Sequence, residues 1–246
     1  MAFIRDVADG VHVITRAHTN MFLIEDQGRL LFIDAGLPAF WSDVKTALTE
    51  LRVGPDAIAG VLLTHAHFDH VGCAHRLHDT WHVPIWVHTA DQQLAAHPYS
   101  YRHELPRWNY PLTHPAGIPK LANMTATGAL TVHGITDTTP LPDLAGLPGS
   151  PVLVETPGHT DGHVAFHLPE RDVLFTGDAL VTLDPYTGHT GPQIVAGAAT
   201  ADSTVALASL RSLEQTGANT ALPGHGGPWR TGIDEAVARA VRRGAH

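Results

Sequence analysis

The fold is decided by one stretch of the sequence, Val61-Leu-Leu-Thr-His65-Ala-His67-Phe-Asp69-His70-Val-Gly72. In this stretch an apolar strand leads directly into four residues that can bind metal ions. If the strand ends near Thr64, His65 and His67 point the same way, because side chains alternate along a strand. Asp69 and His70 would then begin the following helix and turn towards a neighbouring point. The stretch therefore predicts ligands for two adjacent metal ions.

Three further apolar segments each stop at a residue that can bind a metal ion. A glycine precedes each of these residues and allows the backbone to turn tightly without a clash of a Cβ atom. A lone His-x-His is typical of a polar loop, whereas four such strand ends in one chain indicate a metal site. The three segments are Val152-Leu-Val-Glu-Thr-Pro157-Gly158-His159-Thr160, Val173-Leu-Phe-Thr-Gly177-Asp178 and Thr220-Ala-Leu-Pro223-Gly224-His225-Gly226.

The remaining pattern predicts a mixed sheet covered by helices, because early β-rich segments are followed by alternating β and α patterns. The predicted strands are 11–15, 21–25, 30–34, 60–64, 84–88, 152–156, 163–168 and 173–176, and the predicted helices are 39–51, 69–78, 201–214 and 234–243.

Two stretches do not follow this alternation of strands and helices. His97–Lys120 is rich in proline, which opposes regular structure, and in aromatic residues, which need a surface to pack against. A lid insertion at about 97–125 or a homodimer contact would provide that surface, and Tyr99, Trp108 and Tyr110 are candidate substrate contacts. The second stretch, 181–198, is predicted to be a long functional loop, with Tyr186 as a further candidate that is more typical of an exposed loop tyrosine.

Composition narrows the class of protein. The chain has 246 residues, 43% hydrophobic and 16% charged, which is typical of a globular protein and is interpreted as a single domain, 1–246. Its net charge of −9 opposes nucleic acid as a partner. A single cysteine, Cys73, leaves nitrogen and oxygen as the metal ligands. No leader or membrane span is recognised, so we expect a cytoplasmic protein with no membrane partner.

The H-x-H-x-D-H, P-G-H-T, T-G-D and P-G-H-G blocks, in this order, resemble the metallo-β-lactamase superfamily. The resemblance implies an α/β fold, the four-layer αβ/βα sandwich, with the site at one edge. It implies that Asp178 bridges two metal ions and that Asp34 orients a ligand, while His163 is expected to support the site. The ligands it implies are His65, His67 and His159 for the first ion, and Asp69, His70 and His225 for the second.

This resemblance implies a dinuclear hydrolase. Imidazole and carboxylate ligands suit Zn²⁺, although ligand type does not exclude Fe or Mn. Two zinc ions would share a hydroxide that attacks the carbonyl of an ester, thioester or lactone, so the expected substrate is a small molecule. Asp69 and Asp178 are the expected catalytic residues.

The alternatives differ in chemistry. β-Lactamase activity is disfavoured because enzymes that destroy antibiotics usually lack the bridging Asp178 and are exported. The 21 residues after His225 are too few for the helical domain of glutathione thioesterases, and the tyrosine of quorum-signal lactonases is missing, since Tyr186 lies eight positions after Asp178. The second hypothesis is a persulfide dioxygenase-like oxidoreductase with one iron. A non-catalytic metal-binding protein is opposed by the complete set of seven ligands.

Overall fold

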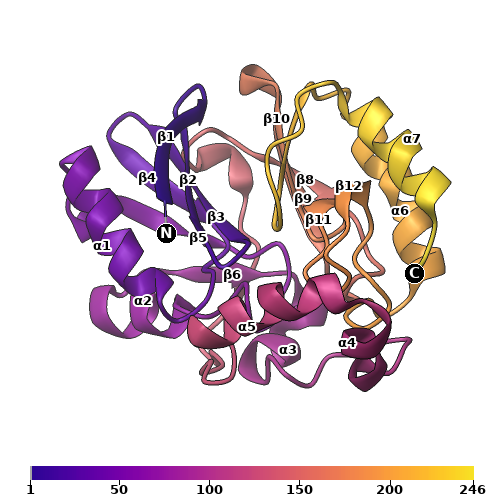
Figure 1. The fold of residues 1–246 in the computed structure, drawn as a ribbon. Coiled ribbons are helices and arrows are strands. Elements are labelled where there is room, and N and C mark those ends of the chain that lie inside the picture. The colour runs from indigo at the N-terminus through magenta and orange to yellow at the C-terminus, as the bar shows by residue number, and fades with distance from the viewer. Residues whose placement is uncertain (1) are drawn as a thin grey trace. The chain divides into compact units, whose positions relative to one another are not determined.

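The structure is a computed structural model that describes residues 2–246, and it divides into two compact units. The first unit comprises the chain up to Tyr99 together with Met124–Pro151, and the second comprises Ser100–Asn123 and Val152–His246. Each unit has its own sheet and its own helices (Figure 1). Over the described residues, no helix has the length and apolar character needed to cross a membrane.

The sheet of the first unit is mixed. Its first four strands are antiparallel, and the later strands pair in parallel. Ala17-His18 and Gln27-Gly28 form two-residue turns with positive φ angles, the conformation that joins twisted antiparallel strands without splaying them. In sheet order the described strands are β1 (Ala2–Ala8), β2 (Val11–Arg16), β3 (Thr19–Asp26), β4 (Arg29–Ile33), β5 (Ile58–Leu62), β6 (Ile85–Val87) and β7 (Thr139–Pro140).

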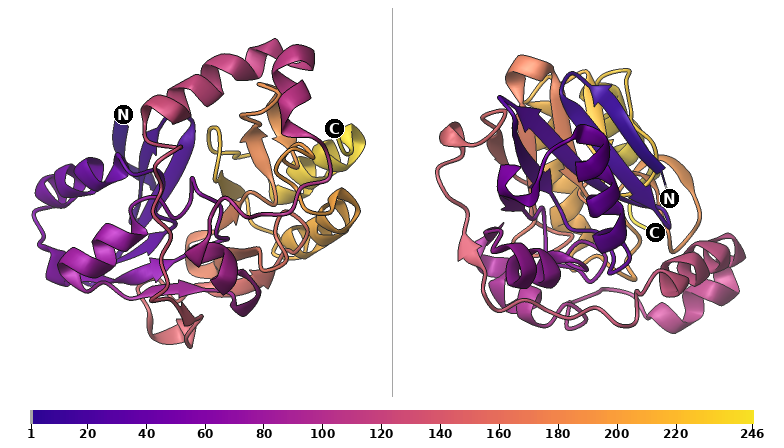
Figure 2. Two further views of the ribbon diagram at one scale, coloured as in Figure 1. Left: turned by 90° about the horizontal axis from the view of Figure 1, so that it is seen from below. Right: turned by 90° about the vertical axis from the view of Figure 1, so that its left-hand side faces the viewer.

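Helix α1 (Phe40–Leu51) packs against this sheet (Figure 2). Phe40, Val44, Ala47 and Leu48 are its buried apolar residues, and this spacing places them along one face of the helix. Two shorter helices belong to the same unit, α2 (Ala74–Trp81) and α3 (Gln92–Ala96). The apolar face of α1 thus packs against β2 of this sheet.

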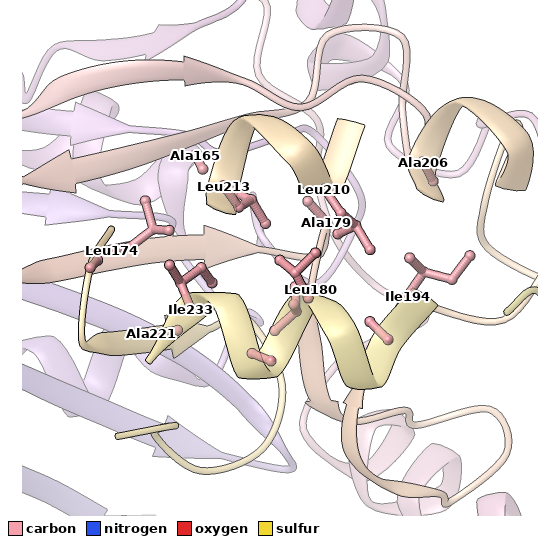
Figure 3. Close-up of a cluster of buried hydrophobic side chains, with 14 residues drawn as sticks. Ala165, Leu174, Ala179, Leu180, Ile194, Ala206, Leu210, Leu213, Ala221 and Ile233 are labelled. Carbon is pink, nitrogen blue, oxygen red and sulfur yellow. The ribbon is translucent and has the colours of Figure 1, made fainter. Parts of the chain in front are cut away.

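The sheet of the second unit has the order β13-β10-β9-β8 over the residues described. Helices α6 and α7 pack together, and their buried side chains form one cluster with residues of β9, β10 and β13 (Figure 3). The elements are β8 (Val152–Glu155), β9 (Val164–Leu168), β10 (Val173–Gly177), β13 (Thr220–Pro223), α6 (Ser203–Glu214) and α7 (Ile233–Arg243).

Proline does not prevent helices in the stretch 97–120, which corrects the expectation from the sequence. Helix α4 (Tyr110–Thr113) has Pro111 in its first turn, and α5 (Ile118–Ala126) has Pro119 as its second residue. Proline is tolerated at these positions because the N–H groups of the first turn have no partner within the helix. The role of this segment as a lid stays a prediction.

The stretch 181–198 is not a single long loop, because it contains the antiparallel strands β11 (Val181–Leu183) and β12 (Thr190–Gln193). Its turn is organised by Asp184, a fully buried carboxylate that accepts hydrogen bonds from the backbone N–H groups of Tyr186 and Ala196. An Asp side chain commonly accepts hydrogen bonds from nearby backbone N–H groups in a turn, so these bonds stabilise the turn.

Candidate metal centre

The first unit places four candidate ligands, His65, His67, Asp69 and His70, between the end of β5 and the start of α2. All four are buried, with at most 5% of each residue exposed. The ring centroid of His65 lies 4.7 Å from that of His67 and 4.2 Å from that of His70. Oδ2 of Asp69 lies 4.0 Å from Nε2 of His70. Three imidazoles and one carboxylate therefore form one buried cluster.

Asp34, which follows β4, determines which ring nitrogen carries the proton in two of these histidines. Its Oδ2 accepts a hydrogen bond from Nδ1 of His70 at 2.8 Å and another from the hydroxyl of Thr64 at 2.9 Å. Because the one hydroxyl proton of Thr64 points to Asp34, Oγ1 of Thr64 accepts from Nδ1 of His65 at 3.0 Å. Both rings therefore carry the proton on Nδ1, and a metal ion would be bound through Nε2.

The backbone around this cluster departs from the predicted helix 69–78. Asp69 and His70 lie in a turn, and the helix begins only at Ala74. The N–H of Gly72 donates to the carbonyl of Gly36 at 2.6 Å, and a Cβ atom at Gly72 would lie 2.4 Å from that carbonyl oxygen. This close packing against the loop after β4 delays the start of the helix.

Asp91 is a supporting residue that sequence reasoning missed. It is 1% exposed, and its Oδ2 accepts a hydrogen bond from the backbone N–H of Ala66 at 3.1 Å. Since Ala66 lies between His65 and His67, this bond holds the backbone that carries both ligands. The sequence marks Asp91 with no local motif, because its partner lies 25 positions earlier in the chain.

The second unit places Asp178 between two histidines. Asp178 directly follows β10, His159 follows β8, and His225 follows β13. Oδ2 of Asp178 lies 3.6 Å from Nε2 of His159 and 3.2 Å from Nε2 of His225. These three residues are at most 3% exposed. A single carboxylate oxygen thus faces both imidazoles.

His163 supports Asp178 through the backbone. Its Nε2 accepts a hydrogen bond from the N–H of Asp178 at 3.0 Å, so the ring proton is on Nδ1. That nitrogen lies 2.8 Å from Oγ1 of Thr156, to which it donates. His163 is fully buried, and both of its nitrogens are engaged in positioning rather than in binding a ligand.

The imidazole of His159 follows the same pattern as those of His65 and His70. Oγ1 of Thr200 donates its proton to the carbonyl of Val195 at 2.7 Å and lies 3.4 Å from Nδ1 of His159. The ring therefore donates from Nδ1 and would bind a metal ion through Nε2.

The predicted substrate contacts lie in different surroundings. Tyr99 stacks on Phe68, with ring centroids 5.6 Å apart, and its hydroxyl donates to a backbone carbonyl. Tyr110 is buried, and burial raises the pKa of its phenol. Trp108 is 75% exposed. A contact of any of these residues with a substrate stays a prediction.

Tyr186 is half-buried rather than exposed, which corrects the expectation for this residue. Its hydroxyl lies 3.0 Å from that of Tyr101, and its ring packs edge-on against that of Tyr110. These contacts give it a packing role within the second unit.

Each unit contributes donors of the types that bind divalent metal ions. Five imidazoles and two carboxylates, all buried, are the residue types that could hold such an ion, and they are His65, His67, Asp69 and His70 in the first unit and His159, Asp178 and His225 in the second. Nitrogen and oxygen donors without thiolate are typical of zinc, iron or manganese sites in enzymes. The fully buried Cys73 adds no thiolate, because burial raises the pKa of its thiol.

Similarity to known proteins extends over most of the chain. A sequence model of the Metallo-beta-lactamase superfamily matches residues 14–225. The probable metallo-hydrolase YflN of Bacillus subtilis is 26% identical over 187 residues, which cover 73% of this chain and 67% of YflN. A hydroxyacylglutathione hydrolase of Fuscovulum blasticum is 28% identical over 65% of this chain and 47% of that protein. For the first curated relatives, the matched region spans 61–67% of their length.

Two solved structures have a similar fold. The metallo-beta-lactamase family protein TTHA1429 of Thermus thermophilus is 25% identical, with a TM-score of 0.64 over 94% of this chain and 78% of that one. TTHA1623 in a di-iron-bound form is also 25% identical, with a TM-score of 0.62 over 91% of this chain and 95% of that one.

Proposed function

Because the chain belongs to the metallo-β-lactamase superfamily and has its α/β fold, we propose that it is a metal-dependent hydrolase with two metal ions. The proposed substrates are small esters, thioesters or lactones. Following the motifs of the superfamily, His65, His67 and His159 would hold one ion. Asp69, His70 and His225 would hold the other, and Asp178 would contact both.

The observation that carries this proposal is the protonation pattern of the buried histidines. Hydrogen bonds from Nδ1 of His65, His70 and His159 direct the lone pair of Nε2 away from the supporting residues. This is the state in which imidazole binds a metal ion, and outer partners of this kind are typical of metal sites. A purely structural cluster of buried histidines would not require the same tautomer in three rings.

When bound, two divalent ions would lower the pKa of a shared water towards about 7 and so provide the nucleophile for hydrolysis. The chain contributes two carboxylates to this site, Asp69 and Asp178, and its other five ligands are imidazoles. Two carboxylates compensate only part of the charge of two divalent ions. With both ions bound, the remaining positive charge would favour an oxyanion on a carbonyl substrate.

One feature supports a carbonyl substrate, and another supports two metal ions over the one-iron oxidoreductase. The name of the relative from Fuscovulum blasticum gives an acyl derivative of glutathione as its substrate. In addition, His225 lies 3.2 Å from Asp178, so the second unit supplies a histidine for a second ion, which a one-iron site would not need.

Elemental analysis tests this proposal. Protein purified without added metal or chelator is expected to contain about two zinc ions per chain and to hydrolyse at least one class in a panel of esters, thioesters and lactones. Asp178→Ala should lose both the second ion and the hydrolysis, whereas Asp56→Ala, which removes an exposed carboxylate, should retain both. One iron per chain, with oxygen uptake and no hydrolysis, would contradict the proposal and support the iron-dependent oxidoreductase.

A further inference from the structure

We propose that Glu104 is a positioning residue for His159 and acts through the first turn of helix α6. This inference rests on the proposed function in one respect, namely that His159 binds a metal ion. Glu104 lies in the proline- and aromatic-rich stretch, 55 positions before His159, and no motif connects the two residues.

The turn that carries His159 rests on the start of α6. The N–H of Ala201 donates to the carbonyl of His159 at 3.1 Å, and the N–H of Asp202 donates to that of Gly158 at 2.9 Å. Gly158 has a φ of +126°, and a Cβ atom there would lie 2.2 Å from the backbone nitrogen of Ala206. The position of His159 is therefore coupled directly to the position of residues 200–206.

Glu104 holds the same residues from the other side. Its carboxylate accepts hydrogen bonds from both the N–H and the hydroxyl of Ser203, the first residue of α6, and the N–H bond is 2.9 Å long. Its own N–H donates to the carbonyl of Thr200 at 3.0 Å. Thr200 is the residue whose hydroxyl contacts Nδ1 of His159. Glu104 thus binds both ends of the segment that orients the imidazole.

The helix does not need Glu104 as its cap. Oδ1 of Asp202 already accepts a hydrogen bond from the N–H of Val205 at 2.9 Å, which is the usual local cap of a helix N-terminus. The carboxylate of Glu104 is a second, distant partner for the same turn. Its contribution is to fix the turn in space rather than to start the helix.

The residues next to Glu104 make further contacts with the segment before α6 and with the chain after His159. The N–H of Leu105 donates to the carbonyl of Gly197 at 3.0 Å, and the side chain of Arg107 donates to that of Ala198 at 3.2 Å. Arg102 forms an ion pair with Asp161, two residues after His159, at 3.0 Å. Residues 102–107 therefore contact the chain just after His159, at Asp161, and the segment 197–203 on which the His159 turn rests. The geometry of a metal ligand depends on such supporting contacts.

Zinc titration of the metal-free protein against a chromophoric chelator tests the role of Glu104. Glu104→Ala is expected to weaken one of the two zinc equivalents by about 10-fold and to leave the other unchanged. Glu104→Gln, which keeps an acceptor for the N–H of Ser203, should weaken it less. Glu214→Gln, at the opposite end of α6, is the matched control and should bind zinc as the wild type does.

A second arm separates positioning from stability. In a His159→Ala background, Glu104→Ala should not weaken zinc binding further, because the ligand that it positions is gone. A fall in the melting temperature of metal-free Glu104→Ala with unchanged zinc affinity would overturn the inference, as would equal losses in both backgrounds. Failure of the wild type to bind zinc would instead contradict the proposed function itself. If Glu104→Ala does not fold, Glu104→Gln and Ser203→Ala decide the outcome by the same measurements.

Discussion

Asp34 connects the backbone and the candidate ligands through a single carboxylate. It has a φ of 65°, a conformation that Asp and Asn adopt more readily than most residues. From this position it accepts hydrogen bonds from the backbone and hydroxyl of Thr64 and from the ring of His70. The residue therefore combines a turn with control of two histidine tautomers.

Asp34→Asn should keep the turn but lose the negative charge that holds the proton on Nδ1 of His70. We expect zinc affinity to fall by about 10- to 100-fold, the range typical of outer partners of metal ligands. Competition with a chelator measures this affinity, and Asp56→Asn provides an exposed control. Unchanged affinity in Asp34→Asn would show that His70 needs no such partner.

His167 predicts part of the pH dependence of stability. Burial lowers the pKa of its imidazole below the ordinary value, and the carboxylate of Asp172 opposes this only in part. The native state therefore binds the proton less tightly than the unfolded chain does. The protonation of His167 therefore costs no stability above about pH 6.5, the ordinary pKa of histidine, and lowers the free energy of unfolding as the pH falls from there towards the lower native pKa.

His167→Gln removes this titration, so its stability should fall less than that of the wild type between pH 7 and the lower native pKa of His167. Urea unfolding midpoints across that range measure the difference. Parallel curves for the two proteins would show that His167 does not contribute to acid sensitivity.

At the scale of elements, the second unit depends on small residues between its helices. Ala206 of α6 and Ala236 and Ala240 of α7 are buried in the cluster of Figure 3, and short side chains allow helices to approach closely. Larger side chains such as Leu210 fill the space between the helices and the sheet. This packing holds Ala206, near the start of α6, in the core of the unit. The turn that carries His159 contacts the same part of the helix.

Leu210→Ala should lower the free energy of unfolding by about 2–5 kcal/mol, because it removes a fully buried side chain and leaves a cavity. Val241→Ala, on the exposed side of α7, should change it by less than about 0.5 kcal/mol. Denaturant unfolding at neutral pH compares the two variants. Equal changes in the free energy of unfolding for the two variants would mean that the buried cluster does not stabilise this unit.

At the scale of the whole molecule, the candidate ligands are divided between the two units, four in the first and three in the second. Under the proposed function, all seven residues bind metal ions. Metal binding would then stabilise the folded chain as a whole, because the unfolded chain does not hold the ligands together.

Excess zinc should therefore raise the melting temperature, with a stabilisation of about 4 kcal/mol when free zinc is 1,000 times the dissociation constant. Scanning calorimetry with and without a chelator measures this shift. Asp178→Ala should reduce it strongly, because this residue would contact both ions. A melting temperature that does not respond to zinc would contradict the proposed metal site.

The sequence by itself determined the family, the main strands and the types of residue that make up the candidate site. These features are local: apolar strands that stop at a ligand, as in β10 followed by Asp178, are visible within a short stretch of chain. The order of four such blocks was enough to predict the α/β fold. The ends of predicted elements were less accurate, since α2 begins only at Ala74.

The tertiary structure decided how the candidate ligands are held. Asp91 supports Ala66 across 25 positions, and Glu104 supports Ser203 across 99. In the segment of β11 and β12, Asp184 accepts hydrogen bonds from the backbone N–H groups of Tyr186 and Ala196. These contacts join residues that are distant in the chain, and a hydrogen bond between distant partners leaves no periodic mark in either segment. Only the folded backbone, which brings the partners together, reveals them.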